Sequence, residues 1–466
     1  MSEMRQMCLE LTQKIGQEVR ILGWVQARRN MGKIVFLDVR DRSAFVQVVG
    51  VPAEVSPESL QALQDVRLEY LVEIKGIVQE RGEKQKNPSL PTGSIELLAK
   101  EVKILSATEA LPFEISGNTK EMNESLRLQY RYLDLRSERM RNNLKKRHEM
   151  NQFLRNFFTA EGFWEIETPC LTKGTPEGSR EYIVPSRLHS GSFYVLPQSP
   201  QQFKQLLMVG GVERYFQIAR CFRDEDQRGD RQPEFTQFDL EMSFVRQEDI
   251  MGLIERAMIE LVEKLYPEKV IQQKPFPVLT YKEAMDQYGV DKPDIRKDKT
   301  DKNVLAFCWV VDFPLFEYSE TDKKLVATHH PFTRPNEEDQ PLLESKPLEV
   351  RARAYDIVLN GFEIGGGSLR IFERELQAKI FELLGLSKEE TEKRFGHMLE
   401  AFTFAPPPHG GLALGLDRII AILQNEENIR EVIAFPKTGD ARDLLMSAPS
   451  PLLDETLKEA HVKIDK

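Results

Sequence analysis

The chain has 466 residues, 41% of them hydrophobic, and a formal net charge of −10. This length predicts two or three domains, and the lack of any run of about 18 apolar residues excludes a membrane-spanning helix. The four cysteines lie far apart, at positions 8, 170, 221 and 308. Their spacing argues against a disulfide framework and predicts a cytoplasmic protein.

Residues 1–105 predict a small β-barrel domain. Five apolar runs separated by turn signals are the expected strands: 19–25, 33–40, 45–49, 68–78 and 94–105. This region contains 15 Lys and Arg against 14 Asp and Glu, a net charge of +1, so the rest of the chain carries −11. The acidic balance therefore does not prevent the barrel from approaching phosphates.

The remaining chain predicts a linker and a second, larger domain. Residues 106–140 form the expected linker, and residues 145–160 show the apolar spacing of a helix that Gly162 would end. In residues 141–466, strand and helix signals alternate without a βαβ rhythm, which favours an α+β fold with an antiparallel sheet flanked by helices. The polar stretch near residues 295–304 is an expected surface connection.

Residues 213–244 predict a long hairpin with a charged face. Strands are expected at 214–225 and 234–244. Period 2 places Arg223 and Glu225 on one face of the first strand, and it groups Gln237, Asp239 and Glu241 on one face of the second. Alone, such a pattern is typical of an exposed sheet with surface salt bridges.

Residues 353–371 predict a second hairpin with a metal site. Asn360-Gly361 is a strong turn signal, which places Asp356 on one strand and Glu363 on the other. Two carboxylates across a hairpin suit Mg²⁺. Gly365-Gly366-Gly367 leaves part of the second strand without side chains, so a ligand can approach the backbone.

Residues 410–423 predict a buried strand followed by a helix. Gly415 ends the strand, and Asp417-Arg418 opens the helix. The guanidinium of Arg418 offers paired donors for a phosphate group.

Three of these segments together resemble the motifs of class II aminoacyl-tRNA synthetases. They are the helix from residue 145 with GFWEIETP at 162–169, FRDE at 222–225 and GLDR at 415–418. The resemblance implies an antiparallel catalytic sheet and a homodimer built on the first motif. The N-terminal barrel, with Gly23-Trp24-Val25, resembles the anticodon-binding OB-fold of the aspartate, asparagine and lysine subgroup.

Within that class the chain resembles aspartate-specific enzymes of bacterial type. The similar segments are QSPQQFK at 198–204, RQPEFTQ at 231–237, HHPFT at 329–333 and GGGS at 365–368. These enzymes carry a large insertion between their second and third motifs. Here only the link at residues 295–304 remains, so we expect the insertion to be absent.

The resemblance implies a two-step reaction and names its residues. Aspartate and ATP would form aspartyl-adenylate, and the aspartyl group would pass to the 3′ end of tRNA(Asp). Whether tRNA(Asn) is also charged stays open. Arg223, Glu363 and Arg418 would be catalytic. The residues expected to hold aspartate are Glu177, Ser199, Gln201, Lys204, Arg223, Asp239, His329, His330 and Arg370.

The nucleotide and the tRNA have their own expected contacts. Those for ATP are Arg223, Asp224, Glu225, Gln232, Glu363, Gly415, Leu416, Asp417 and Arg418. Asp356 and Glu363 would hold Mg²⁺. Arg28, Arg29, Phe36 and Gln47 would contact the anticodon, with a place in the barrel core as the alternative for Phe36.

Three other functions would fit parts of the pattern. An asparagine- or lysine-specific relative is disfavoured by the set of Lys204, Asp239 and Arg370. A catalytically silent paralogue is disfavoured because Arg223, Glu363 and Arg418 are all present. An amidating enzyme on the same fold would not need the barrel.

Overall fold

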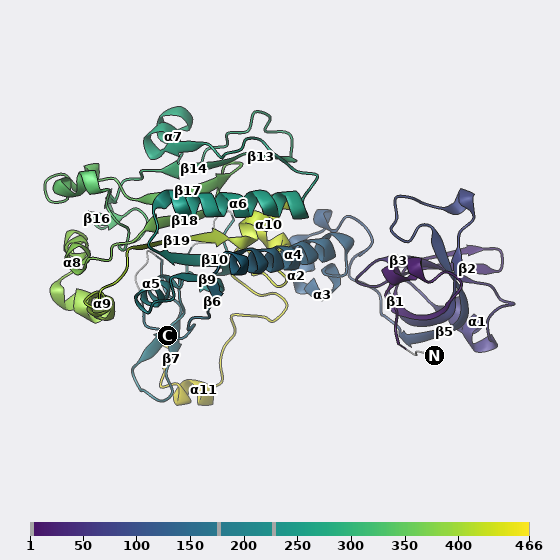
Figure 1. The fold of residues 1–466 in the computed structure, drawn as a ribbon. Coiled ribbons are helices and arrows are strands. Elements are labelled where there is room, and N and C mark those ends of the chain that lie inside the picture. Colours follow the sequence, from purple (N-terminus) through teal and green to yellow (C-terminus); the bar gives the residue numbers. More distant parts are fainter. Residues whose placement is uncertain (1–3, 175–178, 226–229, 466) are drawn as a thin grey trace. The chain divides into compact units, whose positions relative to one another are not determined.

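The computed structural model describes residues 4–174, 179–225 and 230–465, and they form two compact units, Met1–Arg141 and Asn142–Lys466 (Figure 1). None of the described helices is long and apolar enough to cross a membrane.

The first unit contains a closed barrel with strand order β1-β2-β3-β5-β4. Its elements are β1 (Glu18–Met31), β2 (Ile34–Arg40), β3 (Phe45–Gly50), α1 (Pro57–Asp65), β4 (Leu71–Glu80) and β5 (Ile95–Ser106). Inward-facing side chains such as Ile21, Leu37 and Val48 are fully buried, as strand alternation requires. At Gly23 an added Cβ would lie 2.3 Å from the carbonyl oxygen of Arg40, so the crossing strands leave no room for a side chain there.

The barrel differs from expectation in two places. Residues 28–31 continue β1 instead of forming a loop, because Met31 pairs with Ile34 and only Gly32, with φ of +62°, and Lys33 make the turn. Helix α1 was not expected; its N-terminus is capped by the Ser56 hydroxyl, which accepts from the amide of Ser59.

The segment between barrel and sheet is partly helical. It contains α2 (Glu124–Gln129) and α3 (Arg131–Asp134), followed by α4 (Glu138–Ala160). Helix α4 begins seven residues before the expected start, and Gly162, with φ of +82°, follows its end as expected.

The second unit is built on an eight-stranded sheet with order β12-β14-β17-β18-β19-β10-β9-β6. The bounds are β6 (Trp164–Glu165), β9 (Arg214–Phe222), β10 (Glu234–Ser243), β12 (Val278–Thr280), β14 (Phe307–Val311), β17 (Ala354–Leu359), β18 (Phe362–Leu369) and β19 (His409–Gly415). The central pairings are antiparallel, as expected, whereas both edge pairings, β12 with β14 and β6 with β9, are parallel. The sheet is therefore mixed.

Helices cover one face of this sheet. In Figure 1, α4, α6 (Gln247–Leu265) and α10 (Leu416–Leu423) lie across the strands. Met150, Leu154 and Phe158 of α4 are fully buried in the largest apolar core, and Phe153 and Phe157 pack at its edge. The helical periodicity of residues 145–160 is confirmed.

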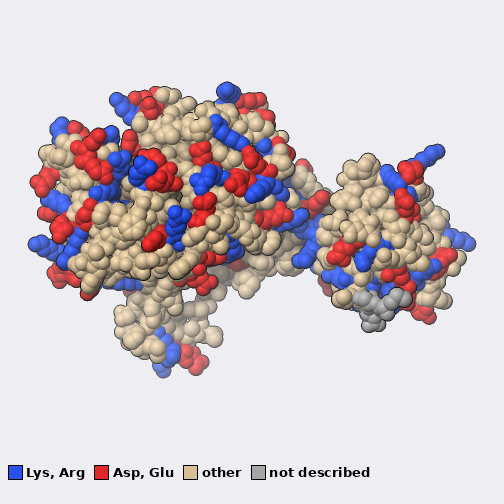
Figure 2. Space-filling view, in the orientation of Figure 1, with Lys and Arg blue, Asp and Glu red and all other residues tan. Residues whose placement is uncertain are grey.

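The second unit also contains shorter strands and further helices outside the eight-stranded sheet. They are β7 (Ile183–Pro185), β8 (Phe193–Val195), α5 (Gln201–Val209), β11 (Val270–Ile271), α7 (Tyr281–Tyr288), β13 (Val304–Leu305), β15 (Phe316–Ser319), β16 (Lys324–Ala327), α8 (Arg374–Leu383), α9 (Lys388–Ala401) and α11 (Asp454–Glu459). On the face shown in Figure 2, acidic and basic side chains are interspersed over the larger unit.

Candidate active site

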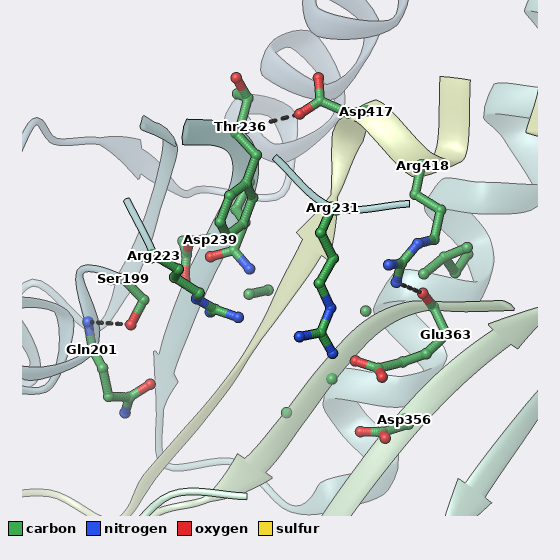
Figure 3. Close-up of a pocket in the computed structure, with 18 of the residues that line it drawn as sticks. Ser199, Gln201, Arg223, Arg231, Thr236, Asp239, Asp356, Glu363, Asp417 and Arg418 are labelled. Carbon is green, nitrogen blue, oxygen red and sulfur yellow. Dashed lines mark hydrogen bonds between the residues drawn. The ribbon is translucent and has the colours of Figure 1, made fainter. Parts of the chain in front are cut away.

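A cavity of about 400 Å³ opens at the middle of the mixed sheet. Its walls come from the N-terminus of α5, the β9–β10 hairpin, β17, β18, β19 and the first turn of α10 (Figure 3). The two hairpins predicted from the sequence thus lie on either side of β19 and supply most of the polar lining. In the second, Asn360 and Gly361 both have positive φ, +53° and +87°, as the turn signal predicts.

The cavity brings together most of the residues expected to bind substrates. These are Ser199, Gln201, Lys204, Arg223, Glu225, Gln232, Asp239, His329, His330, Asp356, Glu363, Arg370, Gly415, Asp417 and Arg418. Asp224 and Leu416 are not among the lining residues, and the Leu416 side chain is fully buried in the apolar core. Glu177 lies outside the described residues.

One end of the cavity is a buried cluster of two cations and two carboxylates. Lys204 Nζ lies 2.9 Å from Asp239 Oδ1 and 3.5 Å from Glu241 Oε2. Arg370 donates to both oxygens of Glu241, from Nε at 2.9 Å and from Nη2 at 3.1 Å. Asp239 Oδ2 is buried and has no hydrogen-bond partner among the described residues. The cluster holds Lys204 and Arg370 in place at the cost of burying charge, which is typical of a binding site.

Two histidines whose pKa values shift in opposite directions adjoin this cluster. Burial lowers the pKa of His330 well below its ordinary value, with help from the charge of Arg370, whose Nη1 lies 2.6 Å from His330 Nε2. A neutral His330 therefore accepts from Arg370. Burial also opposes protonation of His329, but the charge and hydrogen bond of Asp356, at 3.1 Å, outweigh it and raise the pKa.

Asp356 and Glu363 form the expected carboxylate pair. An added Cβ on Gly366 would lie 2.6 Å from Asp356 Oδ1 and 3.7 Å from Glu363 Oε1, so both carboxylates converge on the space above this glycine. The charge of Asp356, and then burial, raise the pKa of Glu363, although Arg418 opposes the shift. Two like charges held this close fit a divalent cation.

Arginines dominate the centre of the cavity. The Arg223 guanidinium lies 5.1 Å from the centre of the Phe235 ring, and its buried Nε has no partner among the described residues. Arg231 pairs with Glu225 at 2.6 Å, and Arg418 donates to the carbonyl of Glu363 at 2.5 Å (Figure 3). These groups can hold phosphate oxygens and a planar ring.

Two predicted nucleotide contacts also hold the site together. Asp417 accepts from the amide of Thr236 at 2.9 Å and from Arg147 of α4 (Figure 3). The Gln232 amide donates to the carbonyl of Lys437 at 3.0 Å and accepts from its N–H at 2.8 Å. Both side chains line the cavity while tying distant segments to the first hairpin.

Sequence reasoning missed Glu241 and Phe235 as site residues. Glu241 shares the β10 face with Gln237 and Asp239, so its period-2 position was a usable signal. Phe235 stood within a segment of family resemblance but received no role. Its partner Arg223 lies just beyond the end of β9, because the strand stops at Phe222 and not at residue 225 as expected.

The outer face of the barrel carries three of the four predicted anticodon residues. Arg29 lies opposite Phe36, and Arg29 Nη2 lies 3.1 Å from Asp38, which lies opposite Gln47. Phe36 is half-buried and outside the barrel core, so its core alternative is wrong. Arg28 points away from this face, and its Nη2 donates to the carbonyls of Leu63 and Gln64 at 3.4 Å each.

The buried ring of His409 predicts acid sensitivity. Burial lowers the pKa of His409 although the charges of Glu241 and Glu373 oppose the shift and Arg370 assists it. Below the ordinary histidine pKa, the unfolded chain binds a proton that the folded protein does not bind. The free energy of unfolding therefore decreases as the pH falls, by up to about 1.4 kcal/mol per pH unit. His329 has the opposite shift, so its stabilisation is already complete in this range.

We expect His409→Gln to remove this part of the slope between about pH 6.5 and pH 5. Denaturant unfolding of both proteins across this range measures it. Parallel pH profiles would contradict a neutral, buried His409.

Comparisons with known proteins agree with this architecture. Residues 123–439 match the family model for class II tRNA synthetases (D, K and N), and residues 19–105 match that for an OB-fold nucleic acid binding domain. The asparaginyl-tRNA synthetase of Pyrococcus horikoshii, solved with asparaginyl-adenylate, has a TM-score of 0.74 at 22% identity, covering 94% of this chain and 99% of that one. Fold and site together define a class II aminoacyl-tRNA synthetase.

Two curated relatives narrow the family. The aspartate–tRNA ligase of Shouchella clausii is 44% identical over 96% of this chain and 97% of its own length. The aspartate–tRNA(Asp/Asn) ligase of Anoxybacillus flavithermus is 42% identical over 98% of each chain. The chain therefore belongs to the aspartate–tRNA ligase family. The first alignment runs over 573 positions, so with 466 residues this chain leaves at least 107 of them empty.

Proposed function

We propose that this protein activates L-aspartate with ATP and transfers the aspartyl group to the 3′ end of tRNA(Asp). We also propose tRNA(Asn) as a second acceptor, because the Anoxybacillus flavithermus relative is named for both tRNA(Asp) and tRNA(Asn). The name of the Shouchella clausii relative specifies neither acceptor. The observation that carries the proposal is the buried cluster of Lys204, Arg370, Asp239 and Glu241 at one end of the cavity.

The cluster favours an amino acid with a short acidic side chain. Lys204 and Arg370 offer donors to a second carboxylate, whereas the amide of asparagine would leave those donors poorly matched. Asp239 Oδ2, Ser199 and Gln201 lie nearby and suit the ammonium group. Glu177, outside the described residues, stays a prediction for the same end.

Arg223 is the proposed link between the two substrates. Its guanidinium can bind the α-carboxylate and the α-phosphate together, which brings the attacking oxygen to phosphorus and stabilises the charge that develops. Adenine is proposed to stack beside the Phe235 ring, which the Arg223 guanidinium approaches to 5.1 Å. Glu225, with Asp224, Gln232 and residues 415–417, is proposed for the nucleotide, and Arg418 for its outer phosphates.

Asp356 and Glu363 are proposed to hold Mg²⁺. Among the described residues no group of three or more His, Cys, Asp or Glu side chains could hold a metal, so the ion would take its other ligands from phosphates and water. Bound there, it would neutralise phosphate charge and orient the leaving pyrophosphate. The raised pKa of Glu363 next to Asp356 supports the fit.

The barrel is proposed to read the anticodon through Phe36, Arg29 and Gln47. A half-buried aromatic ring beside polar side chains on the outer face of a barrel suits stacking with a splayed base. Arg28 remains a proposed contact only through its alkyl part or after a change of rotamer, because its guanidinium bonds to the end of α1.

We predict that the double variant Phe36→Ala, Gln47→Ala lowers the kcat/KM for tRNA charging by about 100-fold, since stacking and base hydrogen bonds contribute about 1–3 kcal/mol each. Aspartate-dependent pyrophosphate exchange should stay within about 2-fold, because the barrel is absent from the cavity. Lys100→Ala, elsewhere on the barrel, is the control. Equal loss in both assays would remove the anticodon role.

A homodimer is proposed on the first motif. Trp164 and Leu171 are exposed by 66% and 53%, and the hairpin of β7 and β8 exposes Leu188 by 74% and Phe193 by 49%. In Figure 2 the protrusion that contains β7 and α11 is mostly uncharged. Apolar patches of this kind mark interfaces. Sedimentation should give the mass of two chains, and a Trp164→Asp variant should shift it toward one.

The link at residues 295–304 is proposed to replace the insertion. The empty alignment positions support this proposal. Near the link, the Gly361 turn approaches Asp294: a Cβ added to Gly361 would lie 3.1 Å from Asp294 Cβ.

The cytoplasm is proposed as the site of action. Family membership and the buried, free thiols of Cys8 and Cys308 support this proposal.

Exchange of pyrophosphate into ATP tests the proposed chemistry directly. We expect exchange with aspartate, Mg²⁺ present, and at least about 100-fold less with asparagine, lysine or glutamate. Charging of purified tRNA(Asp) and tRNA(Asn) then assigns the acceptor. Exchange with asparagine in preference to aspartate would overturn the role of the cation cluster.

A further inference from the structure

A buried chain of hydrogen bonds runs from the cavity to the start of β19. Gln201 Nε2 donates to Gln205 Oε1 at 2.9 Å, Gln205 Nε2 lies 3.2 Å from His409 Nε2, and His409 Nδ1 lies 2.8 Å from the carbonyl of Pro407. The exposed fractions of Gln201, Gln205 and His409 are 5%, 0% and 2%. Only Gln201 lines the cavity.

The far end of this chain determines the direction of every bond in it. A carbonyl oxygen only accepts, so His409 Nδ1 must carry the hydrogen. Burial keeps the ring neutral, which leaves Nε2 as a bare acceptor. Gln205 must then present its NH₂ group to His409 and its oxygen to Gln201.

Gln201 consequently has one amide orientation. Its NH₂ group is committed to Gln205, and its oxygen remains for the cavity. In Figure 3 the amide oxygen of Gln201 is the end nearer the centre of the cavity. An oxygen there accepts from a cationic ammonium, whereas an NH₂ group in its place would repel it.

We propose that Gln205 and His409 are positioning residues that fix the amide polarity of Gln201, so that Gln201 accepts from the ammonium group of the bound amino acid. This rests on the proposed function. Neither residue touches substrate; each acts by making the alternative orientation of the next amide lose a buried hydrogen bond, which is unfavourable.

Three variants of α5 test the relay. Gln205→Met removes both hydrogen bonds at similar volume. Gln205→Glu keeps an acceptor for Gln201 and requires His409 to take a second proton, so the net charge of the pair is unchanged. Gln202→Met is the matched control, because Gln202 is as buried as Gln201 but bonds to His397 of α9 at 2.7 Å and does not line the cavity.

In aspartate-dependent exchange we expect Gln205→Met to raise the KM for aspartate by about 10- to 100-fold, the range for losing a hydrogen bond to a charged group. The KM for ATP and kcat should change less than about 3-fold. Gln205→Glu should restore the KM for aspartate to within about 3-fold, and Gln202→Met should match the wild type. A similar KM in Gln205→Met and the wild type, or an equal rise in Gln202→Met, would overturn the proposal.

Nitrogen NMR of ¹⁵N-histidine protein gives a readout independent of substrate. The chain has only seven histidines, and His409→Gln identifies the signal of interest. We expect one bare ring nitrogen in the wild type and two protonated nitrogens in Gln205→Glu. Two protonated nitrogens in the wild type would refute the relay even if Gln205→Met failed to fold, whereas lack of exchange by the wild type would refute the proposed function alone.

Discussion

Arg223→Ala should lower aspartate-dependent pyrophosphate exchange by about 1000-fold or more, equivalent to about 4 kcal/mol of transition-state stabilisation. Arg223 lines the cavity between the residues proposed to hold the amino acid and those proposed to hold the nucleotide, and its buried Nε has no partner among the described residues. A group that bridges both substrates contributes to binding, alignment and charge stabilisation at once.

The fold should survive this change. The side-chain contact the structure shows for Arg223 is the stacking on Phe235, worth about 1 kcal/mol. Arg256→Ala is the matched control, since Arg256 is 55% exposed and pairs with Glu161 on the helical face. We expect both variants to melt near the temperature of the wild type and only Arg223→Ala to be inactive. Normal exchange by Arg223→Ala would remove it from the reaction.

Arg370→Lys should raise the KM for aspartate by about 100-fold while retaining the fold, a loss of about 3 kcal/mol. Arginine reaches Glu241 with two nitrogens, and its third donates 2.6 Å to Ser368 Oγ, an arrangement that a single ammonium cannot reproduce. Because lysine keeps the positive charge, Glu241 is not left as an unpaired buried anion, so stability should fall only modestly.

The discrimination against asparagine should fall in the same variant, since the substitution displaces one of the two cations that we propose to bind the side-chain carboxylate of aspartate. Arg353→Lys is the matched control, because Arg353 pairs with Glu337 at 2.8 Å and does not line the cavity. Exchange assays with both amino acids measure the effect. An unchanged KM for aspartate would show that Arg370 has only a structural role.

Local patterns in the sequence were enough to predict much of this protein. Strand alternation and turn residues predicted the barrel strands and both hairpins that line the cavity, because each depends on neighbours a few residues away. The Asn360-Gly361 turn is a clear case: its two positive φ angles bring Asp356 and Glu363 to the same side of one hairpin.

Other features depended on contacts between distant segments. Glu241 could be placed on a strand face from its spacing. Only the meeting of α5, β10 and the residue that follows β18 made it the partner of both Lys204 and Arg370. Arg28 and Arg29 are adjacent in the chain, yet the strand continues through them, so one faces Phe36 and the other the end of α1.

The sequence by itself determined which chemistry-bearing residues the protein has and the strands and turns that present them. The tertiary structure alone decided which of them meet, and in which direction their hydrogen bonds run. Gln201 shows the physical reason: its amide orientation follows from the ring of His409, about 200 residues away, because a buried amide must match the donor or acceptor that the fold places beside it.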